Sequence, residues 1–227
     1  MSAPGSEGGR GHFDPEPSLQ FSASEIQDLL IAWLALGLAF AIFFAGGGNR
    51  AIALLTGSPT AFAIALLVSL LTAGVGFLLH EIGHKVVAVR YGNIAAFRAE
   101  YNMLFLAIMS AFLGFIFAAP GAVHHRGRLT ERQHGLIALA GPAVNLVLAA
   151  VFVPLWLGGL ALDIGLLELL GGRGLAVNLF LAAFNMIPIG ALDGRTIVGW
   201  SKAVWAGVFL PSIAVTVYVV FVLGVGF

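Results

Sequence analysis

The stretch that decides the fold is AFAIALLVSLLTAGVGFLL at 61–79, which runs directly into His-Glu-Ile-Gly-His at 80–84. The first part carries no charged residue and is long enough for a bilayer helix, which needs about 20 mostly apolar residues. On a continuous helix His80 and His84 share one face, with Glu81 beside them. Two histidines and a glutamate in this spacing are typical of a catalytic metal site in which the glutamate is the general base.

The location of this motif strengthens the prediction. Ionisable side chains at membrane depth are costly and mark functional sites by default, so three of them have no packing purpose there. The alternative is a polar helix end without function, and it does not account for the spacing. We interpret Lys85 and Arg90, in contrast, as ordinary anchors at the end of the helix.

The composition points to lipid as the solvent. Of 227 residues, 59% are hydrophobic and 10% are charged, whereas soluble domains have about 25% charged residues. The formal net charge is zero, which gives no indication of a nucleic-acid partner. Cysteine is absent, so any metal ligands must be His, Asp or Glu.

The hydropathy pattern predicts an all-α polytopic membrane protein with five to six transmembrane helices, a membrane-dipping segment and a broken helix at the active site. Residues 1–27 are rich in Gly, Pro and Ser, and we expect a disordered tail there, followed by a membrane-embedded domain over 28–227. The predicted spans are Leu29–Gly46, Ala61–Leu79 running on through Val89, Gly135–Leu162, Leu175–Ala191 and Ala203–Phe227.

A sixth apolar segment, Met103–Ala119, decides the topology. Cytoplasmic loops carry the excess of Lys and Arg. If this segment does not cross, nine basic residues share one side and two, Arg50 and Arg173, lie on the other; if it crosses, the bias disappears. A non-crossing segment also brings His84 and Asp193 to the same face. We therefore predict that Met103–Ala119 dips into the membrane, and that the active site faces the cytoplasmic side of the cell membrane.

A zinc site needs a third protein ligand and an open position for water. Asp193 follows an apolar span broken by Pro188 and Gly190, as expected for the wall of a wet cavity. An equally simple interpretation is that Pro188 ends the helix and Asp193 caps a turn. The other downstream carboxylates lie in basic stretches or in a predicted outer loop: Glu100, Glu131, Asp163 and Glu168.

Three segments now resemble the signature of the site-2 proteases, which are intramembrane zinc metalloproteases. They are His80–His84, then Ala140-Gly-Pro-Ala-Val-Asn145, then Asn185-Met-Ile-Pro188 leading to Leu192-Asp193-Gly194. The match spans about residues 60–200, in order. The resemblance implies that Asp193 is the third zinc ligand beside His80 and His84, and that Asn145 and Asn185 contact the substrate or the developing oxyanion.

The remaining polar side chains have simpler interpretations. Asn178 lies on the same broken helix as Asn185, and an interhelical hydrogen bond is the common role for such a residue. His124, His125 and His134 lie in a basic loop with no metal-ligand spacing, so we expect them to be solvated.

The sequence thus predicts a metalloendopeptidase with one Zn2+ per chain that cuts peptide bonds in or near transmembrane helices of membrane protein substrates. Glu81 is the expected general base. Two alternatives stay open. One is a membrane-anchored zincin that cuts soluble or misfolded chains, with Glu100 or Glu131 as third ligand. The other is a metal transporter or scaffold, which would explain the histidines and Asp193 without Glu81.

Overall fold

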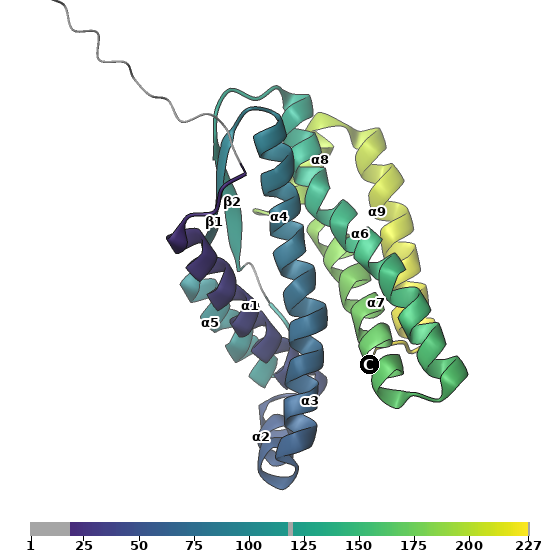
Figure 1. Ribbon diagram of the computed structural model, residues 1–227. Helices are drawn as coiled ribbons and strands as arrows, with labels where there is room; N and C mark the ends of the chain where they lie inside the picture. The colour runs from purple at the N-terminus through teal and green to yellow at the C-terminus, as the bar shows by residue number, and fades with distance from the viewer. Residues whose placement is uncertain (1–18, 118–119, 227) are drawn as a thin grey trace, which may run out of the picture.

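A computed structural model describes residues 19–117 and 120–226 (Figure 1). Within these residues, five helical segments are long and apolar enough to cross a membrane, and the strands form one two-stranded sheet. The prediction of an all-α polytopic membrane protein is confirmed. The five spans are Ala23–Phe44, Pro59–Arg90, Glu131–Leu162, Gly165–Asn185 and Lys202–Val222.

The spans are built from the following elements. The first half of the chain contains α1 (Ala23–Phe44), α2 (Gly48–Gly57), α3 (Pro59–Ser69), the π-helical turn η1 (Leu70–Gly74), α4 (Val75–Arg90), β1 (Ile94–Ala99) and α5 (Tyr101–Phe112). The second half contains β2 (Gly121–Arg126), α6 (Glu131–Leu162), α7 (Gly165–Asn185), α8 (Asp193–Trp200), α9 (Lys202–Val217) and the π-helical turn η2 (Tyr218–Val222).

The first helix begins earlier than the sequence suggested. Ser22 caps α1, with its hydroxyl accepting a hydrogen bond from the backbone N–H of Glu25 at 3.2 Å, and the helix starts at Ala23. The expected boundary of the tail at residue 27 is therefore too late. Residues 1–18 of that tail lie outside the described residues.

The helix that carries the HExxH motif contains a π-helical turn. Helices α3 and α4 are joined through η1, so the apolar run 61–79 is one span with an extra residue in one turn. Such turns weaken the regular backbone bonding. Here the carbonyl of Leu70 accepts a hydrogen bond from the indole of Trp33 at 3.0 Å. This contact fixes α1 against the helix just before the motif.

The segment between α4 and α6 is a hairpin that returns to its starting side. Strands β1 and β2 pair antiparallel, with Ile94 opposite Arg126 and Ala99 opposite Gly121. Helix α5 lies at the far end of this hairpin, beside α1 (Figure 1). Since both ends of the segment meet in one sheet, its described residues 103–117 return to the side that they left, in line with the expectation, and dipping into the membrane without crossing stays a prediction.

Two acidic residues of α1 tie the hairpin to the helices. Glu25 accepts hydrogen bonds from the Lys85 ammonium at 2.6 Å and from the backbone N–H of Phe97 at 3.0 Å. Asp28 accepts one from the Tyr101 hydroxyl at 2.6 Å. Lys85 is 1% exposed. Its interpretation as an ordinary anchor at the helix end is wrong, because Lys85 forms a buried ion pair with Glu25.

Helices α6 and α7 form a close pair with a short connection. Asp163, in the left-handed conformation, ends α6, and α7 begins at Gly165 rather than at Leu175. Glycine explains the difference, because a Cβ at Gly171 would lie 2.2 Å from the backbone nitrogen of Trp156. The expectation of an outer loop containing Glu168 is wrong, since small residues let the two backbones pack closely through this stretch.

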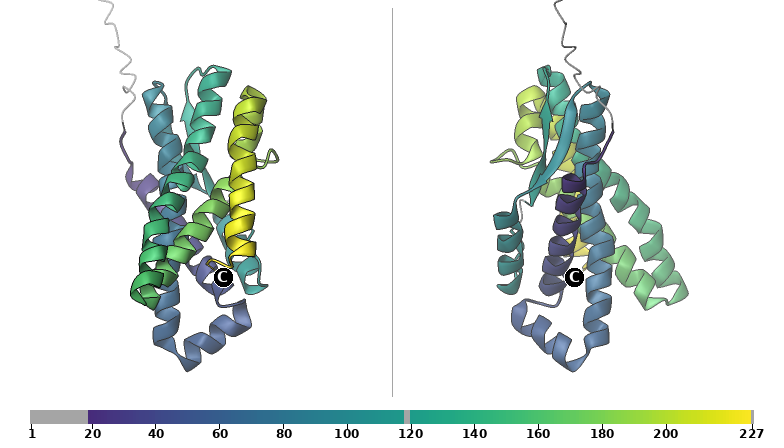
Figure 2. Two further views of the ribbon diagram at one scale, coloured as in Figure 1. Left: turned by 90° about the vertical axis from the view of Figure 1, so that its right-hand side faces the viewer. Right: turned by 60° about the vertical axis from the view of Figure 1, so that its left-hand side comes forward.

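The broken helix is present. Helix α7 ends at Asn185, before the expected end at Ala191, and non-helical backbone follows up to Asp193, the first residue of α8. The carbonyl of Met186 in this break accepts a hydrogen bond from the indole of Trp205 at 2.7 Å. Figure 2 shows α6, α7 and α9 side by side, with the break and α8 at the same end of the molecule as the β1–β2 sheet.

Candidate metal centre

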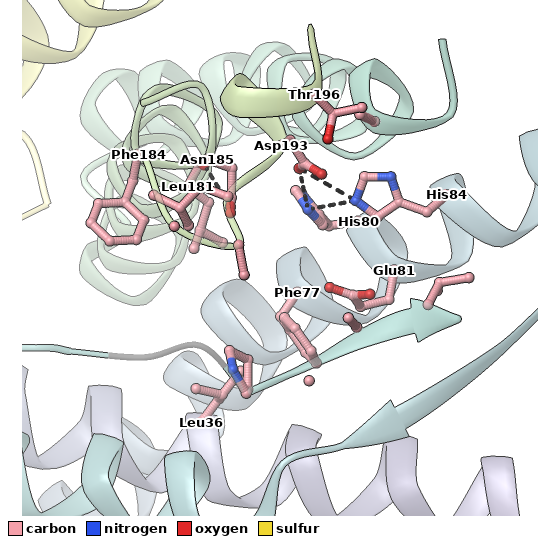
Figure 3. A pocket seen from close by; sticks show the side chains of 18 of the residues that line it. Leu36, Phe77, His80, Glu81, His84, Leu181, Phe184, Asn185, Asp193 and Thr196 are labelled. Carbon is pink, nitrogen blue, oxygen red and sulfur yellow. Dashed lines mark hydrogen bonds and ion pairs between the residues drawn. The ribbon is translucent and has the colours of Figure 1, made fainter. Parts of the chain in front are cut away.

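Two imidazoles of α4 face each other at the centre of the molecule. His80 and His84 are 4% and 6% exposed, and their Nε2 atoms lie 3.0 Å apart. They come from successive turns of one helix, as the spacing predicts. Figure 3 shows both rings pointing away from the backbone of α4 toward the start of α8.

Asp193 completes this group from the other half of the chain. Its Oδ2 atom lies 3.2 Å from Nε2 of His80 and 3.4 Å from Nε2 of His84. The following residue makes this approach possible, because a Cβ on Gly194 would lie 2.0 Å from the carbonyl oxygen of Met186. The glycine lets α8 start directly against the end of α7, with the carboxylate turned toward α4.

Each imidazole is held by a hydrogen-bond acceptor on its far nitrogen. Nδ1 of His84 lies 2.7 Å from the backbone carbonyl oxygen of Ile137, and Nδ1 of His80 lies 2.6 Å from Oδ1 of Asn145. A carbonyl oxygen only accepts, so Nδ1 donates. In a neutral ring Nε2 therefore presents a lone pair, and a positive species, either a proton or a metal ion, must lie between these nitrogens and the Asp193 carboxylate.

The electrostatics keep Asp193 available as a ligand. Burial alone would raise the pKa of its carboxyl group, but when the imidazoles carry protons on Nε2, the positive charge of His84 and the hydrogen bonds from His80 and His84 outweigh burial and lower that pKa to about 2. Asp193 is therefore ionised at neutral pH, as a metal-binding carboxylate must be.

The spacing of the three atoms fits zinc. In a tetrahedral site with bonds of about 2.0–2.1 Å, ligand atoms lie roughly 3.3 Å apart. The three distances here are 3.0, 3.2 and 3.4 Å. Two neutral imidazoles and one carboxylate, each imidazole oriented by an outer acceptor, form a donor set of the kind that catalytic zinc sites use.

Glu81 lies beside this triad, close enough to form with His80 and His84 a group that could itself hold a metal ion. Its carboxylate comes within 4.8 Å of the imidazole nitrogens, and the residue is 6% exposed. Figure 3 shows its carboxylate on the opposite side of the imidazoles from Asp193, toward β2. Its Oε2 atom is buried and accepts no hydrogen bond from the described residues. A carboxylate in this position can take a proton from a water molecule in the cavity.

A cavity of about 470 Å³ opens next to Glu81 and the triad. Most of its wall is apolar and comes from membrane-spanning helices. The principal side chains are Leu36 and Phe40 of α1, Phe77 of α4, and Phe180 and Phe184 of α7, and the start of β2 forms another side. The cavity therefore presents a mostly apolar surface next to the proposed metal ligands.

The structure separates the two asparagines that the sequence grouped together. Asn185 lines the cavity, and its amide donates to the carbonyl of Leu181 at 3.0 Å. Asn145 is fully buried, and its side chain is bonded to His80, Gly76 and Asn178. Substrate contact by either residue stays a prediction, and the observed contacts of Asn145 are with the metal-binding side of the site.

Two further residues line the cavity that the sequence did not indicate, His134 and Thr196. Thr196 lies next to Asp193 (Figure 3). The helical spacing of α6 contains a signal for His134, since 134, 137, 141 and 145 recur every three to four residues and lie on one face. Ile137 and Asn145 of this face hold the imidazoles, and a Cβ on Gly141 would lie 2.5 Å from ring atoms of both.

The site combines an HExxH motif on one helix with a nearby carboxylate that follows a broken helix, inside a bundle of apolar spans. This combination defines a membrane metalloprotease site. Comparison with known proteins agrees. The chain is 38% identical over 204 residues to "Putative zinc metalloprotease MJ0611" of Methanocaldococcus jannaschii, a match that covers 89% of this chain and 97% of that relative. The chain therefore belongs to the zinc metalloprotease family of this relative, as a multi-pass membrane protein with zinc as its cofactor.

Two bacterial relatives carry similar names. "Putative zinc metalloprotease YwhC" of Bacillus subtilis is 31% identical over 147 residues, which are 56% of this chain and 66% of the relative. "Putative zinc metalloprotease Rip2" of Mycolicibacterium smegmatis is 29% identical over 174 residues, which are 69% of this chain and 66% of the relative. No protein-family model and no solved structure matches the chain.

Proposed function

We propose that this protein is an intramembrane protease of the site-2 type, which hydrolyses peptide bonds in or near transmembrane helices of membrane protein substrates. The observation that carries the proposal is the cavity beside Glu81, whose apolar wall comes from the spans α1, α4 and α7. The basic residues on the side of the active site support an orientation toward the cytoplasm of the cell membrane.

The proposed ligands are His80, His84 and Asp193, with one Zn2+ per chain. Zinc held there supplies a Lewis acid that lowers the pKa of a water molecule and polarises the scissile carbonyl. Glu81 takes the proton of the attacking water and returns it to the leaving amine. Asn185 lines the cavity and is the proposed amide donor to the substrate carbonyl.

The position of Asp193 weighs against the zincin alternative with a glutamate as third ligand. Glu100 immediately precedes α5 and Glu131 begins α6, and both are exposed, whereas Asp193 lies within 3.4 Å of both imidazoles. Asp193→Ala should therefore release zinc, and Glu131→Ala should retain it. The opposite result would favour the membrane-anchored zincin.

The experiment that tests the proposal uses the full chain, purified in detergent and reconstituted with a single-span substrate. Zinc content and cleavage are measured together for wild type and for Glu81→Gln. We expect zinc in both and cleavage within the substrate span by wild type alone. Cleavage confined to soluble segments would contradict intramembrane proteolysis. Zinc bound by both proteins with cleavage by neither would favour the transporter or scaffold alternative.

A further inference from the structure

A third buried asparagine stands behind the metal centre. Asn178 lies in the middle of α7 and is 0% exposed. Its amide nitrogen donates to the carbonyl oxygen of Gly174 at 2.8 Å, and its Oδ1 atom accepts from the amide nitrogen of Asn145 at 3.0 Å. Asn145 in turn contacts His80. A chain of hydrogen bonds therefore runs from the backbone of α7 through α6 to an imidazole of α4.

The direction of every hydrogen bond in this chain is fixed. The carbonyls of Gly174 and Gly76 can only accept, so the amide nitrogens of Asn178 and Asn145 must face them. The second N–H of Asn145 then points at Oδ1 of Asn178. With both hydrogens of its amide used, Asn145 has only Oδ1 to present to His80, and Nδ1 of that imidazole must donate.

The consequence reaches the metal-facing side of His80. A ring whose Nδ1 carries the hydrogen offers a lone pair on Nε2, 3.2 Å from Asp193 Oδ2. His84 needs no such chain, because its Nδ1 donates to a backbone carbonyl that cannot rotate. The side chain of Asn145 can rotate, and an amide turned over would place N–H groups against Nδ1. Asn178 and the carbonyl of Gly76 supply the two acceptors that oppose this rotation.

Gly76, which precedes the HExxH motif, leaves room for this chain of hydrogen bonds. A Cβ on Gly76 would lie 2.7 Å from Oδ1 of Asn178, and the carbonyl of Gly76 accepts from Asn145 at 3.1 Å. Three helices therefore meet at one small residue. All the polar side chains involved are excluded from solvent, where each hydrogen bond lost leaves an unsatisfied group.

We propose that Asn178 is a positioning residue for the metal centre, which acts through Asn145 to hold His80 in the tautomer and orientation that bind zinc. The proposal rests on His80 being a zinc ligand. Partners that orient a ligating histidine typically change metal affinity by about 10- to 100-fold when replaced. Asn178 does not touch the imidazole itself, so the lower end of this range applies.

The test measures zinc affinity of the purified full chain by competition with a chromophoric chelator. We expect Asn178→Leu, which keeps the volume and removes both polar atoms, to raise the Kd for zinc about tenfold, and Asn145→Leu to raise it between about 10- and 100-fold. In an Asn145→Leu background, Asn178→Leu should change the Kd by less than about twofold, because sites that act through one another are not additive.

The matched control is Thr216→Val. Thr216 donates to the carbonyl of Leu179 at 3.1 Å, the residue after Asn178, and touches no part of the chain of asparagines. Thr216→Val should lower the melting temperature of the zinc-free protein and leave the Kd for zinc unchanged. A general loosening of α7 would instead weaken zinc binding in both variants.

The outcomes separate this proposal from the ligand set. An unchanged zinc affinity in His80→Ala overturns both the proposed ligand set and the positioning role of Asn178. Loss of zinc in His80→Ala together with an unchanged Kd in Asn178→Leu, or an equal loss with and without Asn145, overturns the role of Asn178 alone. If Asn178→Leu does not fold, Gly76→Ala displaces the same side chain without removing it. A Kd raised by Gly76→Ala supports the proposal, and an unchanged Kd contradicts it.

Discussion

At the scale of single residues, the metal centre depends as much on missing side chains as on those that bind. Gly141 lies where α6 crosses the two imidazoles, and Gly194 lies where α8 meets the end of α7. Neither can contribute a ligand. Each keeps a space open that a methyl group would fill, and in close-packed interiors such a methyl displaces its neighbours.

The first prediction concerns Gly141. In Gly141→Ala the new Cβ would lie 2.5 Å from ring atoms of His80 and His84. Overpacking of this kind costs about 1–3 kcal/mol, and because the displaced groups are the ligands, we expect the cost in zinc affinity, about tenfold or more. The control is Gly158→Ala on the same helix, where the nearest atom is 3.9 Å away. Equal zinc affinities in the two variants would contradict the prediction.

The second prediction concerns Gly194. A Cβ there would lie 2.0 Å from a backbone oxygen, which cannot move aside as the end of a side chain can. Gly194→Ala should therefore shift the start of α8 and with it Asp193, and zinc retained after dialysis should fall well below that of wild type. Gly199→Ala, in the same short helix, has no atom within 4 Å of its Cβ and should bind normally. Comparable zinc retention in both would show that the carboxylate is not tied to this close approach.

At the scale of elements, the ion pair of Glu25 and Lys85 joins α1 to α4 and the strand β1. Both side chains are 1% exposed, and they meet at 2.6 Å. Removing one partner of a buried pair leaves an uncompensated charge, which costs about 3–5 kcal/mol. We therefore expect Glu25→Gln to lower the melting temperature strongly in a thermal unfolding assay.

The comparison for this third prediction is an ion pair that joins α1 to β1 and is open to solvent on its arginine side. Arg98 and Asp28 approach to 3.4 Å, but the Arg98 side chain is 50% exposed. Exposed pairs contribute about 0–1 kcal/mol, so Arg98→Gln should change the melting temperature little. A replacement of both Glu25 and Lys85 by apolar residues should recover part of the stability that Glu25→Gln loses. Equal effects of Glu25→Gln and Arg98→Gln would contradict the ranking.

The limits of the sequence also lie at the level of elements. Local pattern predicts where a span exists, so the apolar runs, the HExxH helix and the break before Asp193 could all be found. Contacts between distant segments are not local. Lys85 reads as an anchor because Glu25, its partner, lies in a stretch that resembles the tail. Asn178 reads as an ordinary interhelical polar residue because its link to His80 passes through another helix.

The predicted start of α7 is wrong for a related reason. Glu168 and Arg173 suggest a loop, yet α7 runs through both because glycines let it pack against α6. The third ligand is an intermediate case. The residues alone are compatible with Asp193 as a metal ligand or as a turn cap, and its approach to His80 and His84 in three dimensions favours the proposed ligand.

At the scale of the whole molecule, the proposed zinc ligands come from both halves of the chain. His80 and His84 belong to α4, and Asp193 begins α8. A metal that binds only the folded protein stabilises it by about 2.7 kcal/mol at a hundred times its Kd. The fourth prediction is that removing zinc with a chelator lowers the melting temperature of wild type and Glu81→Gln alike. Asp193→Asn should show a much smaller response to the chelator, and a full response would argue that the metal binds elsewhere.

The fifth prediction concerns the substrate and follows from the proposed function. Backbone groups of a helix are paired internally, so a transmembrane segment must unwind before its carbonyl can reach Glu81. Placing Gly or Pro near the cut site weakens the helix and should raise kcat/KM in a series of single-span substrates. Substrates with Gly or Pro introduced far from the cut site serve as controls. A series with no dependence on position would count against cleavage of an unwound helix.

The separation of the ligands along the chain has a consequence for biosynthesis. Ribosomes make proteins from the N-terminus, so α4 emerges and inserts long before α8 has been translated. During that interval the nascent chain carries both histidines and the proposed general base but lacks the carboxylate proposed to complete the metal site. If Asp193 is the third ligand, a partly synthesised copy cannot form the complete site, and proteolytic activity has to await the insertion of the last helices.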